Sequence, residues 1–166
     1  MRKALPIAAA LSLLCGAAFA QDKASQKFIT EAIQGNFAEV SMGQLAQQNG
    51  QNQAVKDYGQ MLATDHGAAN QKAQQAATSV GVTNPPSGPN AMQKADYHKM
   101  AKMNGAAFDR EFGKHMVNDH RRDIAAYQKA SKKSDAAGQY AKETLPTLQK
   151  HLQSAQGLTK QKGASR

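Results

Sequence analysis

The chain has 166 residues, of which 40% are hydrophobic, 5% aromatic and 20% charged, with one cysteine and a formal net charge of +9 at pH 7. This length fits one domain with a core of its own and leaves little room for two. A basic protein of this kind can approach an anionic surface, but the lack of tryptophan and the few aromatic residues argue against nucleic-acid binding, which relies on aromatic stacking.

The first residues, 1–20, have the three parts of a cleavable secretory signal. Arg2 and Lys3 form a positively charged start, an apolar run follows, and small residues ending in Ala20 form the cleavage motif. The apolar run is shorter than the roughly 20 residues that cross a bilayer, and no later segment is apolar enough to do so. We therefore expect an exported chain with a charge of +7, no cysteine and no transmembrane segment, periplasmic or peripherally attached to the outer membrane.

The remaining sequence favours helices. It is rich in Ala, Gln, Lys, Met and Leu, poor in β-branched residues, and shows no sustained alternation of polar and apolar residues. The pattern predicts four long helices and a short one, over residues 24–48, 53–80, 91–103, 106–131 and 135–158. The first helix should end at Asn49 and Gly50, where glycine can take the left-handed conformation.

The connection between the second and third long helices is the longest one in the chain. Residues 81–89 contain three prolines, which lack an amide donor and cannot continue a helix. Pro146 should kink the last helix, and residues 161–166 are expected to form a disordered tail. Residues 21–160 thus predict a four-helix bundle with a long crossover connection that contains the short extra helix. An open helical array is the main alternative.

Four polar residues fall on the apolar faces of the long helices. At 100° per residue, the apolar arcs of the last three long helices contain His66, His120 and His151, and the arc of the first contains Glu39. All four lie near the middle of their helices, and at about 1.5 Å per residue their depths differ by only about 5 Å. The sequence therefore predicts that one carboxylate and three imidazoles converge in a central layer.

Two interpretations of this layer remain open. A closed hydrogen-bonded network is the usual state of buried histidines and carboxylates, whereas three histidines and a carboxylate also suit a transition-metal ion such as zinc, iron, manganese or copper. Asp65, Asp119 and Asp123 flank the layer, where they could hold the imidazoles from outside or stay solvated. His98 and His115 are expected at the surface.

Several motifs in the chain resemble those of one bacterial family. They are Phe37-Ala38-Glu39-Val40, Asp65-His66, Phe108-Asp109 and Leu145-Pro146 followed by His151-Leu152. Over residues 25–158 the chain resembles the family called domain of unknown function 4142. Its members are often labelled predicted outer membrane proteins and are placed with the ferritin-like helical bundles, so the resemblance implies a ferritin-like fold and supplies no activity.

The ferritin-like di-iron pattern Glu-x-x-His is not found at the three core histidines. The residues three positions before them are Ala63, Val117 and Leu148. The leading hypothesis is therefore an exported bundle that binds a metal ion or an envelope partner without catalysis, and no catalytic or organic-cofactor residues are assigned. The alternatives are a metalloenzyme with redox or hydrolytic chemistry at this layer, and a structural or stress-associated envelope protein without metal. The sequence does not determine the oligomeric state.

Overall fold

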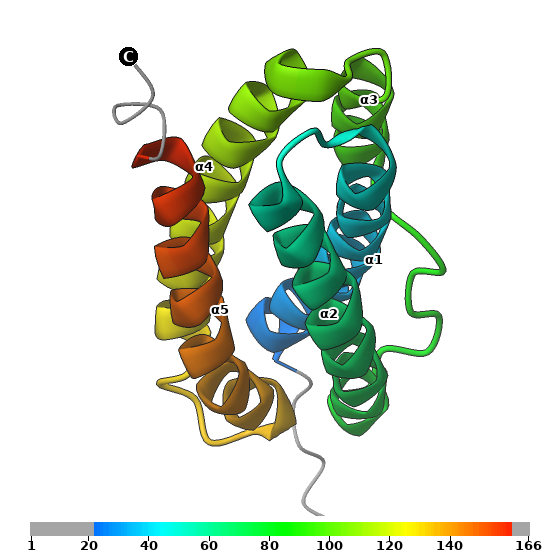
Figure 1. Ribbon diagram of the computed structural model, residues 1–166. Helices are drawn as coiled ribbons and strands as arrows, with labels where there is room; N and C mark the ends of the chain where they lie inside the picture. Colours follow the sequence, from blue (N-terminus) through cyan, green and yellow to red (C-terminus); the bar gives the residue numbers. More distant parts are fainter. Residues whose placement is uncertain (1–21, 161–166) are drawn as a thin grey trace, which may run out of the picture.

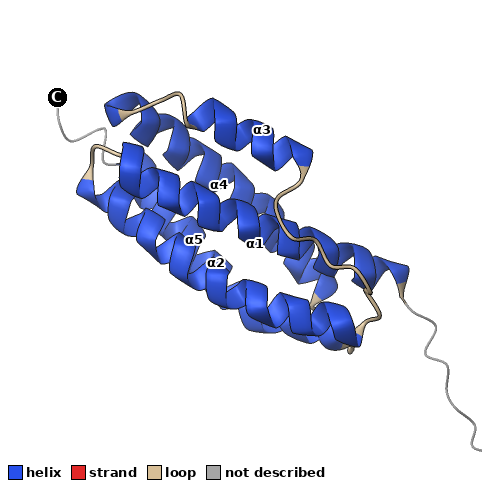
Figure 2. Cartoon of the chain, turned by 90° about the vertical axis from the view of Figure 1, so that its right-hand side faces the viewer, coloured by secondary structure: helices blue, strands red, loops and turns tan. Residues whose placement is uncertain are grey.

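The computed structural model describes residues 22–160, which form five helices and no strand (Figure 2). The helices are α1 (Lys23–Asn49), α2 (Gln53–Ser79), α3 (Ala91–Met100), α4 (Gly105–Ala130) and α5 (Ala136–Lys160). The predicted all-α class is confirmed, and the main difference in length is that α3 ends at Met100. The predicted signal, residues 1–20, and the predicted tail, residues 161–166, lie outside the described residues.

The four long helices lie side by side as two antiparallel pairs. Short turns join α1 to α2 and α4 to α5, while the proline-containing segment and α3 lead from one end of α2 back to the start of α4 (Figure 1). In the view turned by 90°, α3 runs along the outside of α1 and α4 (Figure 2). α5 continues as a helix through Pro146. No helix within the described residues is both long enough and apolar enough to span a bilayer.

Asparagine and aspartate side chains fix the start of three helices. At a helix N-terminus the first amides lack partners in the helix, and a side-chain oxygen that accepts from one of them stabilises the end. Asp22 accepts from Ala24, and Asn52 accepts from Ala54. Asn90 and Gln93 form a reciprocal capping box at the start of α3.

The predicted left-handed glycine at the end of α1 is wrong. Gly50 has φ −66° and ψ 143°, which is extended backbone, because the chain turns directly into the start of α2. Asp109 of α4 holds this turn by accepting from the amides of Gln51 and Asn52, at 3.0 and 2.9 Å. Glycine is needed here for space, since a Cβ would lie 2.6 Å from the carbonyl oxygen of Ala46.

Close packing of α1 on α2 aligns the residues of these two helices. Gly43 and Gly59 face one another, and a Cβ on either would lie within 2.5 Å of the other's carbonyl oxygen. Two glycines allow backbones to approach closely only because no side chain separates them. This contact fixes the register of the α1–α2 pair and so sets which residues of α1 face His66.

Two apolar clusters fill the bundle above and below a polar layer. One cluster contains Ile29 and Ile33 with residues from the ends of α2, α4 and α5 on the same side. The other contains Leu62 and Phe112 with their neighbours toward the opposite end. Between them lie the buried polar side chains Asn36, Glu39, His66, His120 and His151. The core is therefore divided by a central polar layer.

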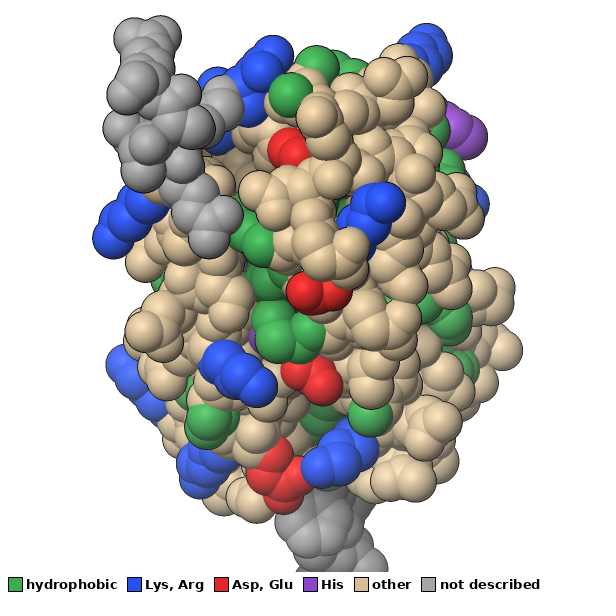
Figure 3. All heavy atoms as spheres, viewed as in Figure 1, with side chains coloured by type: hydrophobic (Ala, Val, Ile, Leu, Met, Phe, Trp, Pro, Cys, Tyr) green, Lys and Arg blue, Asp and Glu red, His purple; other side chains and the backbone are tan. Residues whose placement is uncertain are grey.

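Charges of both signs share the outer surface. On the face that α2 and α5 form, Lys and Arg side chains are spread out rather than gathered in one patch, and acidic side chains lie among them (Figure 3). Exposed pairs such as Lys72 with Glu143 fit solvated helix surfaces, where ion pairs add little stability.

Candidate metal centre

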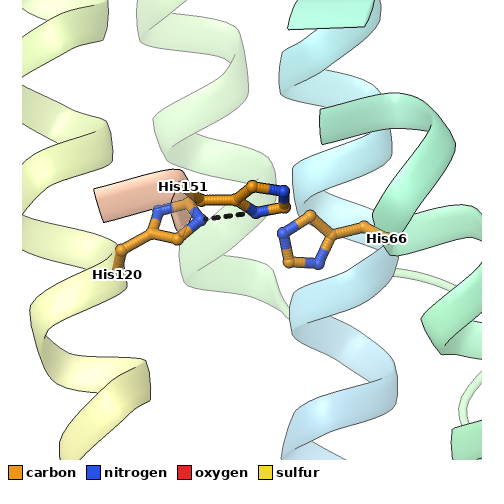
Figure 4. A group of neighbouring side chains, drawn as sticks. All are labelled: His66, His120 and His151. Atoms are coloured by element: carbon orange, nitrogen blue, oxygen red, sulfur yellow. Dashed lines mark hydrogen bonds between the residues drawn. The ribbon is translucent and has the colours of Figure 1, made fainter. Parts of the chain in front are cut away.

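Three histidines from three helices meet in the polar layer. His66 of α2 is 4% exposed, and His120 of α4 and His151 of α5 are fully buried. One ring nitrogen of each lies within 4.8 Å of the corresponding nitrogens of the other two. Figure 4 shows the three rings with these nitrogens turned toward one another. The helical phase of the three residues had predicted this inward orientation.

The outer nitrogen of each ring contacts a hydrogen-bond acceptor. The three pairs are His66 Nδ1 with Asn36 Oδ1 at 2.9 Å, His120 Nδ1 with the Met116 carbonyl oxygen at 3.0 Å, and His151 Nε2 with Asp65 Oδ2 at 2.8 Å. Because an oxygen of these kinds can only accept, each outer nitrogen must carry the proton and donate it. The three contacts therefore fix the tautomer of all three rings.

The inner nitrogens are consequently left with lone pairs. A neutral imidazole has one proton, so His66 Nε2, His120 Nε2 and His151 Nδ1 are all acceptors. His66 Nε2 has no hydrogen-bond partner. His120 Nε2 and His151 Nδ1 lie 3.4 Å apart, and the contact marked between them in Figure 4 would be a hydrogen bond only if one of the two carried a proton. Two nitrogens bound to a tetrahedral zinc ion at about 2.1 Å are about 3.4 Å apart. His120 and His151 therefore already have the spacing of two zinc ligands, and the nitrogen of His66 lies within 4.8 Å of both.

The environment keeps these rings uncharged. Burial lowers the pKa of His66 well below its usual range, and the neighbouring His120 and His151 lower it further. Burial also lowers the pKa of His120 to about 4 and that of His151, although Asp65 acts against the shift at His151. Neutral imidazole is the form that binds metal ions, so no proton has to be displaced near neutral pH.

Glu39 occupies the same layer but does not join the group of three. Its side chain is 2% exposed, and its Oε2 has no hydrogen-bond partner. Burial raises the pKa of Glu39 well above its usual range, and the neighbouring carboxyl group of Asp119 raises this pKa further. Two neighbouring carboxyl groups in a buried layer cannot both stay ionised unless a cation lies between them, and otherwise one of them keeps a proton. Glu39 therefore faces a second acid rather than the histidines.

The flanking acids have different environments. Asp65 accepts from His151, whereas Asp119 pairs with Arg122 and lies beside Glu39. Asp123 is half-buried, and burial followed by the charge of Asp119 raises its pKa to about 7. The structure thus places one flanking acid against an imidazole and the other two together.

The remaining two histidines lie away from the group of three. His98 is exposed on α3, as expected. His115 of α4 is half-buried and lines a cavity, so its expected surface position is only partly met.

Sequence reasoning missed the residues that orient His66. Asn36 accepts from His66 and donates through Nδ2 to the Tyr140 hydroxyl at 3.0 Å, and this hydroxyl lies 3.3 Å from that of Tyr127. A signal was present, since Asn36 lies seven residues after Ile29 on the apolar face of α1.

Comparison with protein families identifies the chain. It matches the family described as Domain of unknown function (DUF4142) over residues 14–158, so it belongs to that family. Comparisons with curated proteins and with solved structures give no match.

Proposed function

We propose that this member of the DUF4142 family is an exported, ferritin-like four-helix bundle that binds a transition-metal ion through His66, His120 and His151. One observation carries the proposal: each outer nitrogen donates to a fixed acceptor, so that three lone pairs converge. A hydrogen-bonded network without metal would require a proton between the inner nitrogens, and the three outer acceptors favour keeping the protons outside.

The ligand set indicates which ions fit. Imidazole nitrogen suits zinc and copper and also binds iron, while three protein ligands on a tetrahedral ion leave a fourth position for water or another donor. The two antiparallel helix pairs and the long connection between them support the ferritin-like arrangement. Export is supported by the signal-like composition of residues 1–20. A role in binding rather than catalysis follows from the burial of all three rings.

Thermal unfolding with and without metal tests the binding site. Adding Zn²⁺ to the chelator-treated full chain should raise the melting temperature, and one ion should bind per chain. A ligand that binds only the folded state stabilises it by about 2.7 kcal/mol at a free concentration of about 100 times its Kd. Native mass spectrometry checks the stoichiometry.

Histidine variants provide the controls. His66→Ala, His120→Ala and His151→Ala should each abolish most of the gain, whereas His98→Ala, at an exposed position on α3, should retain it. If the layer is a metal-free network, the three core variants should still lose about 1 to 3 kcal/mol, but no transition metal should stabilise the unaltered chain. That outcome would overturn the metal site. Export is tested separately, by an intact mass that begins at Gln21 in periplasmic protein.

A further inference from the structure

A cavity of about 450 Å³ lies between α1 and α4 and reaches the polar layer. Residues at the start of α3 form part of its rim, among them Met92, which is 76% exposed. His66, which is 4% exposed, also lines the cavity, so the cavity ends beside the histidine group. The α1–α4 side of the bundle therefore contains a cavity, whereas the Gly43–Gly59 contact packs α1 closely against α2.

Five acidic side chains line this cavity, and three of them, Glu39, Asp119 and Asp123, are close neighbours. Asp119 and Asp123 are four residues apart on α4 and therefore share a helix face. Opposite them, Glu39 of α1 is 2% exposed, and its Oε2 has no hydrogen-bond partner. Arg122 also lines the cavity, but its side chain is 68% exposed and pairs with Asp119. A buried carboxyl group is costly unless a proton or a cation neutralises it, and a bound cation would also give the free oxygen a partner.

We propose that Glu39, Asp119 and Asp123 form a second cation site, which holds a hydrated divalent ion through oxygen ligands alone. Carboxylate oxygen and water are the ligands that magnesium, calcium and manganese prefer. The volume of the cavity lets such an ion keep several of its waters, as these ions usually do when few carboxylates bind them. The ion would supply the positive charge that Glu39 lacks. The proposal does not rest on metal binding by the histidines.

Mn²⁺ titration followed by electron paramagnetic resonance tests this site, because bound Mn²⁺ loses the sharp signal of the free ion. The full chain is first given one equivalent of Zn²⁺ to occupy the histidines. It should then bind one Mn²⁺ per chain. Glu39→Gln and Asp119→Asn should each weaken Mn²⁺ binding by about tenfold or more, as the loss of a metal-site carboxylate does, while the Zn²⁺ content stays the same.

Two controls separate this site from general charge effects. Glu143→Gln makes the same chemical change on α5, at a side chain that is 48% exposed and pairs with Lys72, and should keep the original Mn²⁺ affinity. Thermal unfolding of each variant verifies that it folds.

Two results would overturn the second site: Mn²⁺ that stays free in the presence of the unaltered chain, and Mn²⁺ that binds Glu39→Gln as tightly as the unaltered chain. The first would mean that the carboxyl groups share protons instead. Failure of Zn²⁺ to bind would contradict the histidine site alone, since the Mn²⁺ titration still reports on the carboxyl groups.

Discussion

The dipeptide Asp-His occurs twice in the polar layer, and its two copies have different partners. On α2, Asp65 accepts a hydrogen bond from His151 of α5 at 2.8 Å. On α4, Asp119 precedes His120 in the same way but lies beside the carboxyl group of Glu39 on α1. One acid therefore meets a buried imidazole, and the other meets a second acid besides its pair with Arg122.

This difference shows that the neighbouring helix decides what the motif does. On the α2–α5 side, the carboxylate holds a proton on one nitrogen of His151 and leaves the other nitrogen free, which is how outer carboxylates support metal-binding histidines. On the α1–α4 side, carboxyl groups crowd around a cavity without enough donors, an arrangement that a bound cation would relieve. The α2–α5 side therefore orients a histidine for metal binding, whereas the α1–α4 side has carboxyl groups that a bound cation would neutralise.

The largest expected effect is that the contribution of His120 to the stability of the metal-free chain is lost in acid. The pKa of His120 is about 4 in the folded chain and about 6.5 when unfolded. Its folded pKa is lowered, so its contribution to stability is complete above about pH 6.5 and is lost as the pH falls toward 4. This difference corresponds to about 3 kcal/mol. Urea unfolding in the presence of a chelator, between about pH 7.5 and pH 4.5, measures the change.

The carboxyl groups of the cavity act in the opposite direction. Glu39 and Asp123 have raised pKa values, so protonating them as the pH falls restores stability and hides part of the histidine effect. Glu39→Gln should therefore make the acid loss steeper, and His120→Gln should make it shallower. Equal slopes for the unaltered chain and His120→Gln would contradict the burial of a neutral imidazole at this position.

The next largest effect is a difference in stability between the variants Asp65→Ala and Asp119→Ala. Without Asp65, the fully buried ring of His151 loses its acceptor, which should cost about 2 kcal/mol. Without Asp119, Glu39 loses a neighbouring acid and only the exposed pair with Arg122 is broken, so stability should be unchanged or higher. Urea unfolding of the two chelator-treated variants at about pH 7.5 measures both values.

The affinity for Zn²⁺ should also differ between Asp65→Ala and Asp119→Ala. Asp65→Ala should weaken Zn²⁺ binding by about 10 to 100 times, because the tautomer of His151 is no longer fixed. Asp119→Ala should leave it nearly unchanged. A similar loss of stability and of Zn²⁺ affinity in both variants would mean that the two acids have equivalent roles after all.

The sequence predicts the layer because helical phase and depth are local properties. His66, His120 and His151 lie on apolar arcs near the middle of long helices, and regular geometry is sufficient to bring such residues to one level. Phase also predicted the burial of Glu39, which is 2% exposed. The helix bounds follow from the prolines, glycines and capping residues.

Contacts between helices could not be predicted in the same way. Which acid meets which residue depends on rotation and spacing of the helices, and these are set by contacts such as Gly43 against Gly59. The sequence therefore placed Asp65 and Asp119 beside the layer without distinguishing them. The carbonyl group of Met116 gave no signal at all, since every residue carries a carbonyl.

The smallest expected effect concerns Asp123, which adds to the crowding on the α1–α4 side. Burial and then Asp119 raise its pKa to about 7, from about 3.9 in an unfolded chain. The contribution of Asp123 to stability is thus present at low pH, where the carboxyl group is protonated. It is lost as the pH rises through 7, because the half-buried carboxylate is unfavourable. Because solvent reaches the half-buried side chain and screens its charge, only part of this pKa shift converts into stability. Asp123→Asn should therefore stabilise the chelator-treated chain at about pH 7.5 by about 1 kcal/mol, and much less at about pH 5.

Added Mn²⁺ sharpens this last test, because Asp123 is also a ligand of the proposed second site. With Mn²⁺ at about pH 7.5, the unaltered chain should gain stability and Asp123→Asn should gain little, so that the order of the two melting temperatures reverses. If Asp123→Asn is the less stable chain without metal, its carboxylate must have a favourable partner. The α1–α4 side would then not differ from the α2–α5 side at Asp123, because this acid too would have a favourable partner.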